Sequence, residues 1–243
     1  MKSIDIRGLT KRYGELVALD ALTLQIKDGE ALALLGVNGA GKTTAIKLLS
    51  CLTPPDGGDA TLGGFSIRQE AARVKEIINV SPQETAVAKK LTVRENLQFI
   101  AELHGNKPQN ARERVEDLIA ELGLSAVRDR RAGTLSGGWQ RRLSIAMALV
   151  SEPKILFLDE PTLGLDVIAR HELWQLIEKL KGRITVLLTT HYLEEAEALC
   201  DRIAILSGGK LVTVGTAGEI KALAGCERFE DAFVRLCAGE VKR

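Results

Sequence analysis

The chain has 243 residues, enough to bury one sizeable hydrophobic core, and 45% of them are hydrophobic, as in a globular protein. Thirty-three basic and thirty-two acidic residues leave a formal net charge of +1, which excludes bulk electrostatic attraction to nucleic acid or to an anionic membrane surface. No run approaches the roughly 18 apolar residues of a membrane-spanning helix, and the charged N-terminal residues 1–20 do not resemble a signal peptide. We therefore expect a cytosolic chain. The four cysteines form no C-x-x-C pair and lie near no histidine at metal-ligand spacing, which favours free thiols.

The N-terminal part of the chain has the pattern of a β-structure that leads into a helix. Apolar residues alternate over much of residues 3–26, which predicts antiparallel strands, and a turn at residues 27–29 leads to a short apolar strand at 31–35. Residues 42–51 have helical spacing and are followed by Pro54 and Pro55, which a helix does not tolerate. The stretch between this strand and this helix is rich in glycine.

That stretch matches the pattern G-x-x-x-x-G-K-[ST], with Gly36, Gly41, Lys42 and Thr43 at its defining positions. Glycines allow several backbone N–H groups to converge on one anion, and a lysine and a helix N-terminus add positive charge. A threonine hydroxyl at this position is suited to ligate Mg²⁺. The pattern therefore predicts binding of the β- and γ-phosphates of a nucleotide.

The middle of the chain is predicted to be mainly helical. Short strands at 60–62 and 77–80 precede it, and the second delivers Gln83 just beyond its end. From residue 91 to 152 apolar residues recur at helical spacing, which indicates a helical insert. Leu135-Ser136-Gly137-Gly138 precedes the last helix of this insert, and Ser136 is a natural N-cap.

The remaining chain alternates strands and helices, which predicts a largely parallel sheet. An apolar strand at 155–158 ends at Asp159 and Glu160, and a strand at 184–189 ends just before His191. Helices are expected at 167–180 and 194–199, a hairpin at 203–214, and short helices at 220–223 and 229–237. We expect one α/β domain over residues 1–243, with a phosphate-loop core, an N-terminal antiparallel subdomain, a helical subdomain at about 91–152, and a C-terminal hairpin with helices at about 203–243.

Taken together, the phosphate loop, the LSGG stretch before the strand that ends in Asp159-Glu160, and the isolated Gln83 and His191 resemble the ATP-binding-cassette (ABC) ATPases over nearly the whole chain. The resemblance implies ATP and Mg²⁺ as cofactors. It implies catalytic roles for four residues: Glu160, His191, Gln83 and Lys42. It implies Mg²⁺ ligation by three: Thr43, Gln83 and Asp159. It implies nucleotide contacts by Tyr13, Gly36, Asn38, Gly39, Ala40, Gly41, Lys42, Thr43, Thr44, Ser136, Gly137 and Gly138.

Several of these roles depend on the family pattern more than on the residue type. A lone tyrosine is more often part of a β core than an adenine-stacking ring, and a lone histidine is more often buried than catalytic, so Tyr13 and His191 gain their roles only from the resemblance. Adjacent buried carboxylates at 159 and 160 need a nearby cation, which favours function on physical grounds. The resemblance also implies that residues 136–138 contact ATP held by a second subunit, and that residues 164–166 cross the dimer interface.

The sequence departs from the family pattern at two positions. Val37 stands where many relatives have proline, and its side chain is expected to point away from the phosphates. Leu135-Ser136-Gly137-Gly138 resembles the signature motif of the family, and Trp139 stands where this signature usually continues with glutamine, which leaves the detail of the dimer interface open.

A single cassette of this size is similar to the ATPase subunit of a transporter whose membrane segments form a separate permease chain. Phe229-Glu230-Asp231-Ala232-Phe233 resembles a terminal element of the branch that exports drugs, sodium, lipids or polysaccharides, although a short amphipathic helix packed on its own core gives the same residues. The expected partners are a permease and a second copy of the chain, without nucleic acid, and the expected location is the cytoplasmic face of the membrane. The alternatives are an importer subunit and a soluble ABC ATPase acting on DNA or ribosomes.

Overall fold

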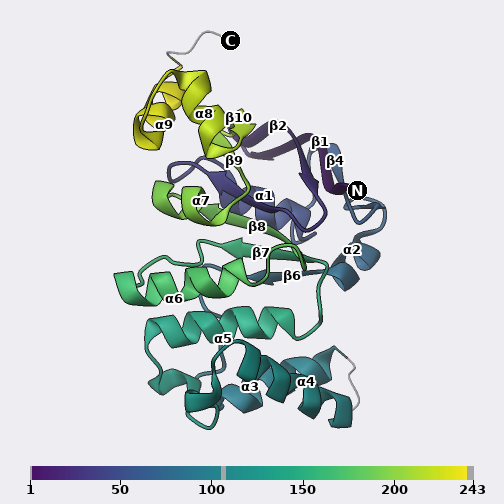
Figure 1. Ribbon diagram of the computed structural model, residues 1–243. Helices are drawn as coiled ribbons and strands as arrows, with labels where there is room; N and C mark the ends of the chain where they lie inside the picture. The colour runs from purple at the N-terminus through teal and green to yellow at the C-terminus, as the bar shows by residue number, and fades with distance from the viewer. Residues whose placement is uncertain (1, 105–107, 240–243) are drawn as a thin grey trace.

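The computed structural model describes residues 2–104 and 108–239, which form two β-sheets with helices around them (Figure 1). The first sheet is antiparallel, with strand order β2-β1-β4-β5. Its strands are β1 (Lys2–Tyr13), β2 (Leu16–Lys27), β4 (Gly57–Leu62) and β5 (Phe65–Ser66).

The second sheet has strand order β10-β9-β3-β8-β7-β6, and all neighbours are parallel except the β9–β10 pair. Its strands are β3 (Ala31–Leu35), β6 (Ile78–Ser81), β7 (Ile155–Asp159), β8 (Thr185–Thr190), β9 (Arg202–Ser207) and β10 (Lys210–Gly215). Because β3, β7 and β8 are parallel neighbours, their carboxyl ends meet at one edge, where ligands bind in open α/β sheets.

Helices cover the sheets and extend from them at both ends of the molecule in Figure 1. They are α1 (Lys42–Leu49), α2 (Ala71–Ile77), α3 (Val93–Leu103), α4 (Pro108–Glu121), α5 (Gly137–Leu149), α6 (Val167–Glu178), α7 (Leu193–Leu199), α8 (Ala217–Ala224) and α9 (Phe229–Cys237). Helices α3 and α4 lie at one end, and α8 and α9 at the opposite end. Among the described helices, none is both long and apolar enough to cross a membrane.

The alternation of side chains along β3 divides the core in two. Ala31, Ala33 and Leu35 face a core shared with α5, α6 and α7, whereas Leu32 and Leu34 face a core shared with α1 and the antiparallel sheet. Both faces of β3 are fully buried, which explains its continuous apolar sequence.

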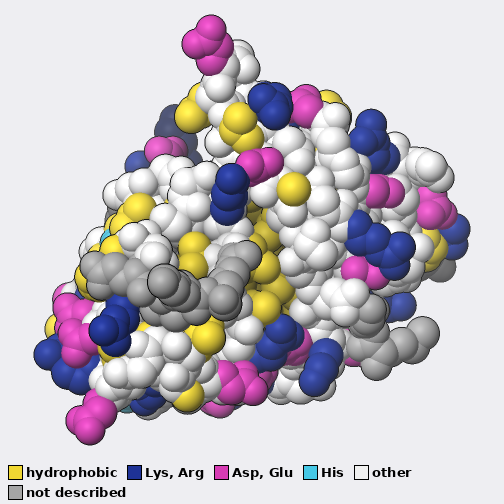
Figure 2. Space-filling view, turned by 90° about the horizontal axis from the view of Figure 1, so that it is seen from above, with side chains coloured by type: hydrophobic (Ala, Val, Ile, Leu, Met, Phe, Trp, Pro, Cys, Tyr) yellow, Lys and Arg dark blue, Asp and Glu magenta, His cyan; other side chains and the backbone are white. Residues whose placement is uncertain are grey.

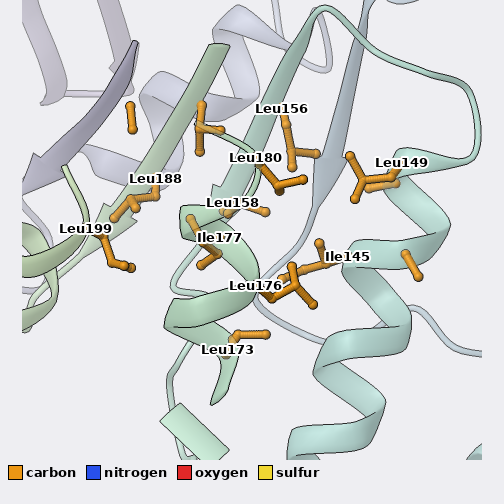
Figure 3. Packing of buried hydrophobic residues seen from close by; sticks show 14 of the residues in the cluster. Ile145, Leu149, Leu156, Leu158, Leu173, Leu176, Ile177, Leu180, Leu188 and Leu199 are labelled. Atoms are coloured by element: carbon orange, nitrogen blue, oxygen red, sulfur yellow. The ribbon is translucent and has the colours of Figure 1, made fainter. Parts of the chain in front are cut away.

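Figure 3 shows how the first of these cores is built. Side chains of α5 (Ile145, Leu149) and of α6 and the residues after it (Leu173, Leu176, Ile177, Leu180) converge on strands β7 and β8. This packing fixes the helix that follows the signature against the strand that ends in the acidic pair.

The structure confirms the predicted α/β architecture and adds elements that the sequence did not reveal. Helix α2 was not predicted, because it buries only Val74 and therefore lacks apolar periodicity. The predicted strand at 77–80 was one residue early, since Ile77 ends α2 and β6 begins at Ile78. The predicted helix at 42–51 ends at Leu49, and Cys51 adopts a left-handed φ of 56°.

The C-terminal helices pack on the body of the molecule. Helix α8 has a capping box between Thr216 and Glu219, and α9 buries Phe229, Ala232 and Leu236 in the core shared with α6 and α7. The Phe229–Phe233 segment is thus amphipathic. The four cysteines have free thiols.

Candidate nucleotide-binding site

The loop between β3 and α1 is shaped by glycines at positions where other residues would collide. A Cβ on Gly36 would lie 2.5 Å from the Leu206 carbonyl oxygen, and one on Gly41 would lie 2.5 Å from the Ala18 carbonyl oxygen. Gly41 also has a φ of 103°, which side chains rarely adopt. The loop can therefore follow this path only with glycine at both positions.

Helix α1 begins directly at Lys42 and presents an uncapped N-terminus to this loop. Its N-cap residue makes no side-chain hydrogen bond, and its first turn contains no acidic residue. The first backbone N–H groups of a helix have no partner within it and favour an anion. The loop and helix together are suited to phosphate oxygens.

Lys42 lies at the centre of the site and is almost fully buried. Its ammonium group donates to the Gly36 carbonyl at 2.7 Å and lies 3.2 Å from Glu160 Oε1. The side chain is thus held by the loop's own backbone and pointed at the carboxyl end of the sheet.

A second cluster joins the first turn of α1 to the ends of β7 and β8. Asp159 Oδ1 accepts hydrogen bonds from the hydroxyls of Thr43, at 3.2 Å, and Thr189, at 2.6 Å. Oxygen donors of this kind suit Mg²⁺, which in nucleotide sites is commonly held by one or two protein groups together with phosphates and water. Among the described residues there is no cluster of three or more His, Cys, Asp or Glu able to hold a metal alone. The residues present thus fit Mg²⁺ bound together with a nucleotide.

Glu160 is held in a strained conformation beside this cluster. Its φ is 49°, in the left-handed region, and its backbone N–H donates to the Thr189 hydroxyl at 3.0 Å. One carboxylate oxygen faces Lys42, and the other lies 2.8 Å from His191 Nδ1. The carboxylate is 7% exposed, so it is sheltered and has cationic or hydrogen-bonding partners on both sides.

These residues line a cavity of about 680 Å³ that opens beside the loop. Tyr13 lies at its rim, with 47% of the residue exposed and the Lys11 ammonium 5.6 Å from its ring centre. Gln83 follows β6, is exposed, and also lines the cavity. The full lining comprises Tyr13, Leu16, Val17, Ala18, Asn38, Gly39, Ala40, Gly41, Lys42, Thr43, Thr44, Gln83, Glu160, Leu163, His191 and Gly208.

The signature residues lie outside this cavity. Ser136 is the N-cap residue of α5, as predicted, but its side chain makes no capping hydrogen bond. Ser136 and Gly137 are exposed and Gly138 is partly exposed, so the N-terminus of α5 faces solvent. Trp139 is half-buried against the core, with the Arg142 guanidinium 4.8 Å from its ring centre.

The structure thus brings most of the predicted site residues together and leaves the three signature residues apart. The phosphate loop, Tyr13, Gln83, Glu160 and His191 share one cavity, with Asp159 bonded to Thr43 beneath it. His104 and His171, which had no predicted role, are exposed.

One residue of the site was missed by the sequence analysis. The Thr189 hydroxyl donates to the Asp159 carboxylate and accepts from the Glu160 backbone N–H, so it joins both acidic residues. The available signal was a threonine at the end of a buried strand, opposite two carboxylates at the end of another.

Comparison with known proteins agrees with this geometry. The family model described as "ABC transporter" matches residues 19–163, which contain the phosphate loop, the signature and the acidic pair. The chain belongs to the ABC transporter family. As a member with this fold, it is an ABC ATPase.

The similar curated proteins are ATP-binding proteins named for resistance or export. The chain is 41% identical to a doxorubicin resistance ATP-binding protein of Mycobacterium tuberculosis, over 99% of this chain and 72% of that protein. It is 43% identical to a daunorubicin/doxorubicin resistance ATP-binding protein of Streptomyces peucetius, over 92% and 68%. A Nod factor export ATP-binding protein of Burkholderia orbicola is 41% identical, over 93% and 75%.

Solved structures of ABC cassettes have the same fold. An ATP-binding subunit of an ABC transporter superposes with a TM-score of 0.84 at 28% identity, covering 96% of this chain and 98% of that one. A dimeric cassette in a post-hydrolysis state with bound ADP and Pi superposes with a TM-score of 0.78 at 26% identity, covering 88% and 98%.

Proposed function

We propose that this ABC ATPase is the nucleotide-hydrolysing subunit of an exporter, in which MgATP joins two copies of the chain head to tail beneath a separate permease. The observation that supports this most directly is the separation of the site into two parts. The phosphate loop and its proposed catalytic partners line one cavity, whereas the signature at the start of α5 is exposed and does not line it.

In this proposal the phosphates bind the backbone of residues 36–44, and the Lys42 ammonium contacts the β- and γ-phosphates. Tyr13 stacks on the adenine ring, which its exposed position at the cavity rim allows. Phosphoryl transfer needs positioning and charge stabilisation more than covalent catalysis, and the loop, the lysine and the helix N-terminus provide both.

Thr43, Asp159 and Gln83 would hold Mg²⁺, which would neutralise charge on the phosphates when bound. Glu160 orients or deprotonates the attacking water, and His191, hydrogen-bonded to that carboxylate, fixes its direction. The sheltered position of the Glu160 carboxylate, between the Lys42 ammonium and the His191 ring, supports this role.

The second subunit supplies Ser136, Gly137 and Gly138 to the γ-phosphate. A helix N-terminus with an exposed serine hydroxyl and two small residues is suited to approach an anion closely. The dimeric cassette with ADP and Pi among the solved relatives supports this arrangement.

The names of the relatives support export and a membrane partner. Resistance and Nod factor export proteins at about 41% identity favour a permease-bound location on the cytoplasmic side of the membrane. Helix α3 has two exposed apolar side chains, Phe99 and Leu103. The same helix is connected to the segment after Gln83, because the Asn96 side chain accepts a hydrogen bond from the Ala88 backbone N–H. Basic and acidic side chains are interspersed on the face in Figure 2, which gives no support to a nucleic-acid partner.

The test is purification of the tagged chain from membranes of its native cell. We expect a polytopic permease to co-purify, and the complex in lipid vesicles to hydrolyse MgATP faster than the chain alone, with Glu160→Gln abolishing turnover. Recovery of a solute-binding protein with the complex would indicate an importer instead. Co-sedimentation with ribosomes or DNA, with no permease, would contradict the proposal.

A further inference from the structure

Arg141 is a buried arginine on the signature helix that contacts the loop containing Gln83. It lies in the first turns of α5 and is 5% exposed. One guanidinium nitrogen donates to the Pro82 carbonyl oxygen at 2.6 Å, and the other donates to the Gln83 carbonyl oxygen. Among the described residues, Arg141 forms no ion pair with a carboxylate. Burying a charge is costly: desolvation lowers the pKa of Arg141, and the nearby carboxylates of Asp159 and Glu195 partly offset this. The hydrogen bonds of the guanidinium group go to two backbone carbonyls of one loop.

Further polar contacts connect the same two elements. The buried hydroxyls of Ser144 and Ser81 are 3.0 Å apart, and the Asn79 amide donates to the Ser151 hydroxyl at 3.1 Å. Arg141, Ser144 and Ser151 recur at helical spacing and follow one line along α5 and its C-terminal end. The side of the helix that faces β6 is therefore joined to it by polar contacts in an otherwise apolar core.

Of these contacts between α5 and the β6 region, the two hydrogen bonds of the Arg141 guanidinium are the ones that reach the loop containing Gln83. Two parallel donors on successive carbonyls fix both the position and the orientation of the peptide between them. The orientation of that peptide sets the direction in which the Gln83 side chain leaves the backbone. Gln83 is exposed at the cavity, and Arg141 restrains its backbone.

We propose that Arg141 is a positioning residue for Gln83, connecting the loop that contains Gln83 to the helix that begins at the signature. This inference rests on the role proposed above for Gln83 near Mg²⁺ and the attacking water.

The first test measures the contact itself, without activity. Glutamyl endopeptidase cleaves after Glu84, which is exposed directly beside the restrained peptide. We expect Arg141→Ala to raise the rate of cleavage there roughly tenfold, as loss of two hydrogen bonds allows the loop to open. Arg114→Ala is the matched control, because Arg114 also donates to a carbonyl of α5, that of Leu149, but at the other end of the helix. Equal cleavage in wild type and Arg141→Ala, or faster cleavage at every exposed glutamate, would overturn the proposal.

The second test is a double-mutant cycle on MgATP hydrolysis. We expect Arg141→Ala to lower kcat about tenfold with little change in the KM for ATP, Arg141→Lys to retain part of the rate, and Arg114→Ala to have little effect. Because Arg141 acts through Gln83, Arg141→Ala should cause no further loss in a Gln83→Ala background. Losses that multiply would show that Arg141 acts independently of Gln83 and overturn the proposal. If Gln83→Ala alone left kcat unchanged, the role of Gln83 would be wrong, while the cleavage experiment would still decide whether Arg141 restrains the loop.

Discussion

The phosphate loop and the signature both lie at helix N-termini, yet they differ in how many of their partners the chain itself supplies. Around α1, Lys42, Asp159 and Glu160 are buried: Lys42 donates to the Gly36 carbonyl and pairs with Glu160, and Asp159 accepts from Thr43. At α5 the serine and the first glycine are exposed, and the serine side chain caps nothing. In the dimer proposed above, the first site is built within one chain and the second acts on ATP held by the other. Substitutions at the two should therefore fail in different ways, the first in nucleotide binding and the second in dimerisation and turnover.

The largest effect is expected for Lys42→Ala. It removes the positively charged side chain of the loop and leaves Glu160 without its buried cationic partner. We expect ATP affinity to fall roughly tenfold to a hundredfold or more, since hydrogen bonds to charged groups are the strong ones. Isothermal titration calorimetry measures it, with Lys47→Ala, in the last turn of the same helix, as control. Unchanged affinity with reduced turnover would mean that the backbone alone binds the phosphates.

Gly137→Asp should abolish hydrolysis while leaving ATP affinity and folding nearly unchanged. A Cβ at this position meets nothing closer than Leu165 Cδ2 at 3.7 Å, so the subunit accepts the side chain. In the dimer, the carboxylate would face the γ-phosphate of the partner's ATP and repel it. Thermal unfolding, calorimetry and phosphate release separate these effects.

Gly41→Ala tests the phosphate loop as Gly137→Asp tests the signature. Its Cβ would lie 2.5 Å from the Ala18 carbonyl at a φ of 103°, so we expect a clear loss of thermal stability together with loss of ATP binding. A Gly41→Ala protein as stable as Gly137→Asp would show that the loop is less constrained than its geometry indicates.

A smaller effect is expected for Trp139→Gln. The indole packs against the core and the Arg142 guanidinium, not on Ser136. The variant should retain most ATPase activity, because backbone N–H groups and Ser136 make the phosphate contact. In wild type, Trp139 fluorescence should change on dimerisation with MgATP, with Trp174 as background. Activity as low as that of Gly137→Asp would show that the indole organises the signature.

The smallest effect concerns Glu195, which is fully buried in α7. Desolvation raises the pKa of its carboxyl, partly offset by the nearby Thr190, Thr162 and Trp174 side chains. At Glu195 the folded protein thus binds a proton more tightly than the unfolded chain does. The stabilisation from this proton is fully present below the pKa of Glu195 in the unfolded chain, and it is lost as pH rises through the pKa of Glu195 in the folded protein. Glu195→Gln resembles the protonated form and should raise the melting temperature by a few degrees at about pH 8, with a smaller difference near pH 5. An equal difference at both pH values would contradict the shift.

The residues of the phosphate loop could be predicted from the sequence because the requirements of such a loop are local. A loop of this length requires Gly36, Gly41 and Lys42 at fixed positions. Two acids at the end of a buried strand are costly unless a cation lies nearby. Thr189 and Arg141 were missed because their partners lie far along the chain, 30 residues away for Asp159 and 59 for Pro82. A hydroxyl or a guanidinium acquires such a role only through the fold. Helix α2 was missed because it buries one residue and so leaves no periodicity to detect.

The central claim is that the ATP site is complete only between two subunits. Size-exclusion chromatography with light scattering tests this claim directly. Glu160→Gln should bind MgATP, slow hydrolysis roughly a hundredfold or more, and accumulate as a dimer that wild type populates only briefly. Adding Gly137→Asp to Glu160→Gln should return the protein to monomer with MgATP bound. A Glu160→Gln protein that stays monomeric at saturating MgATP, both alone and with its permease, would contradict the account. So would a double variant that dimerises as well as Glu160→Gln.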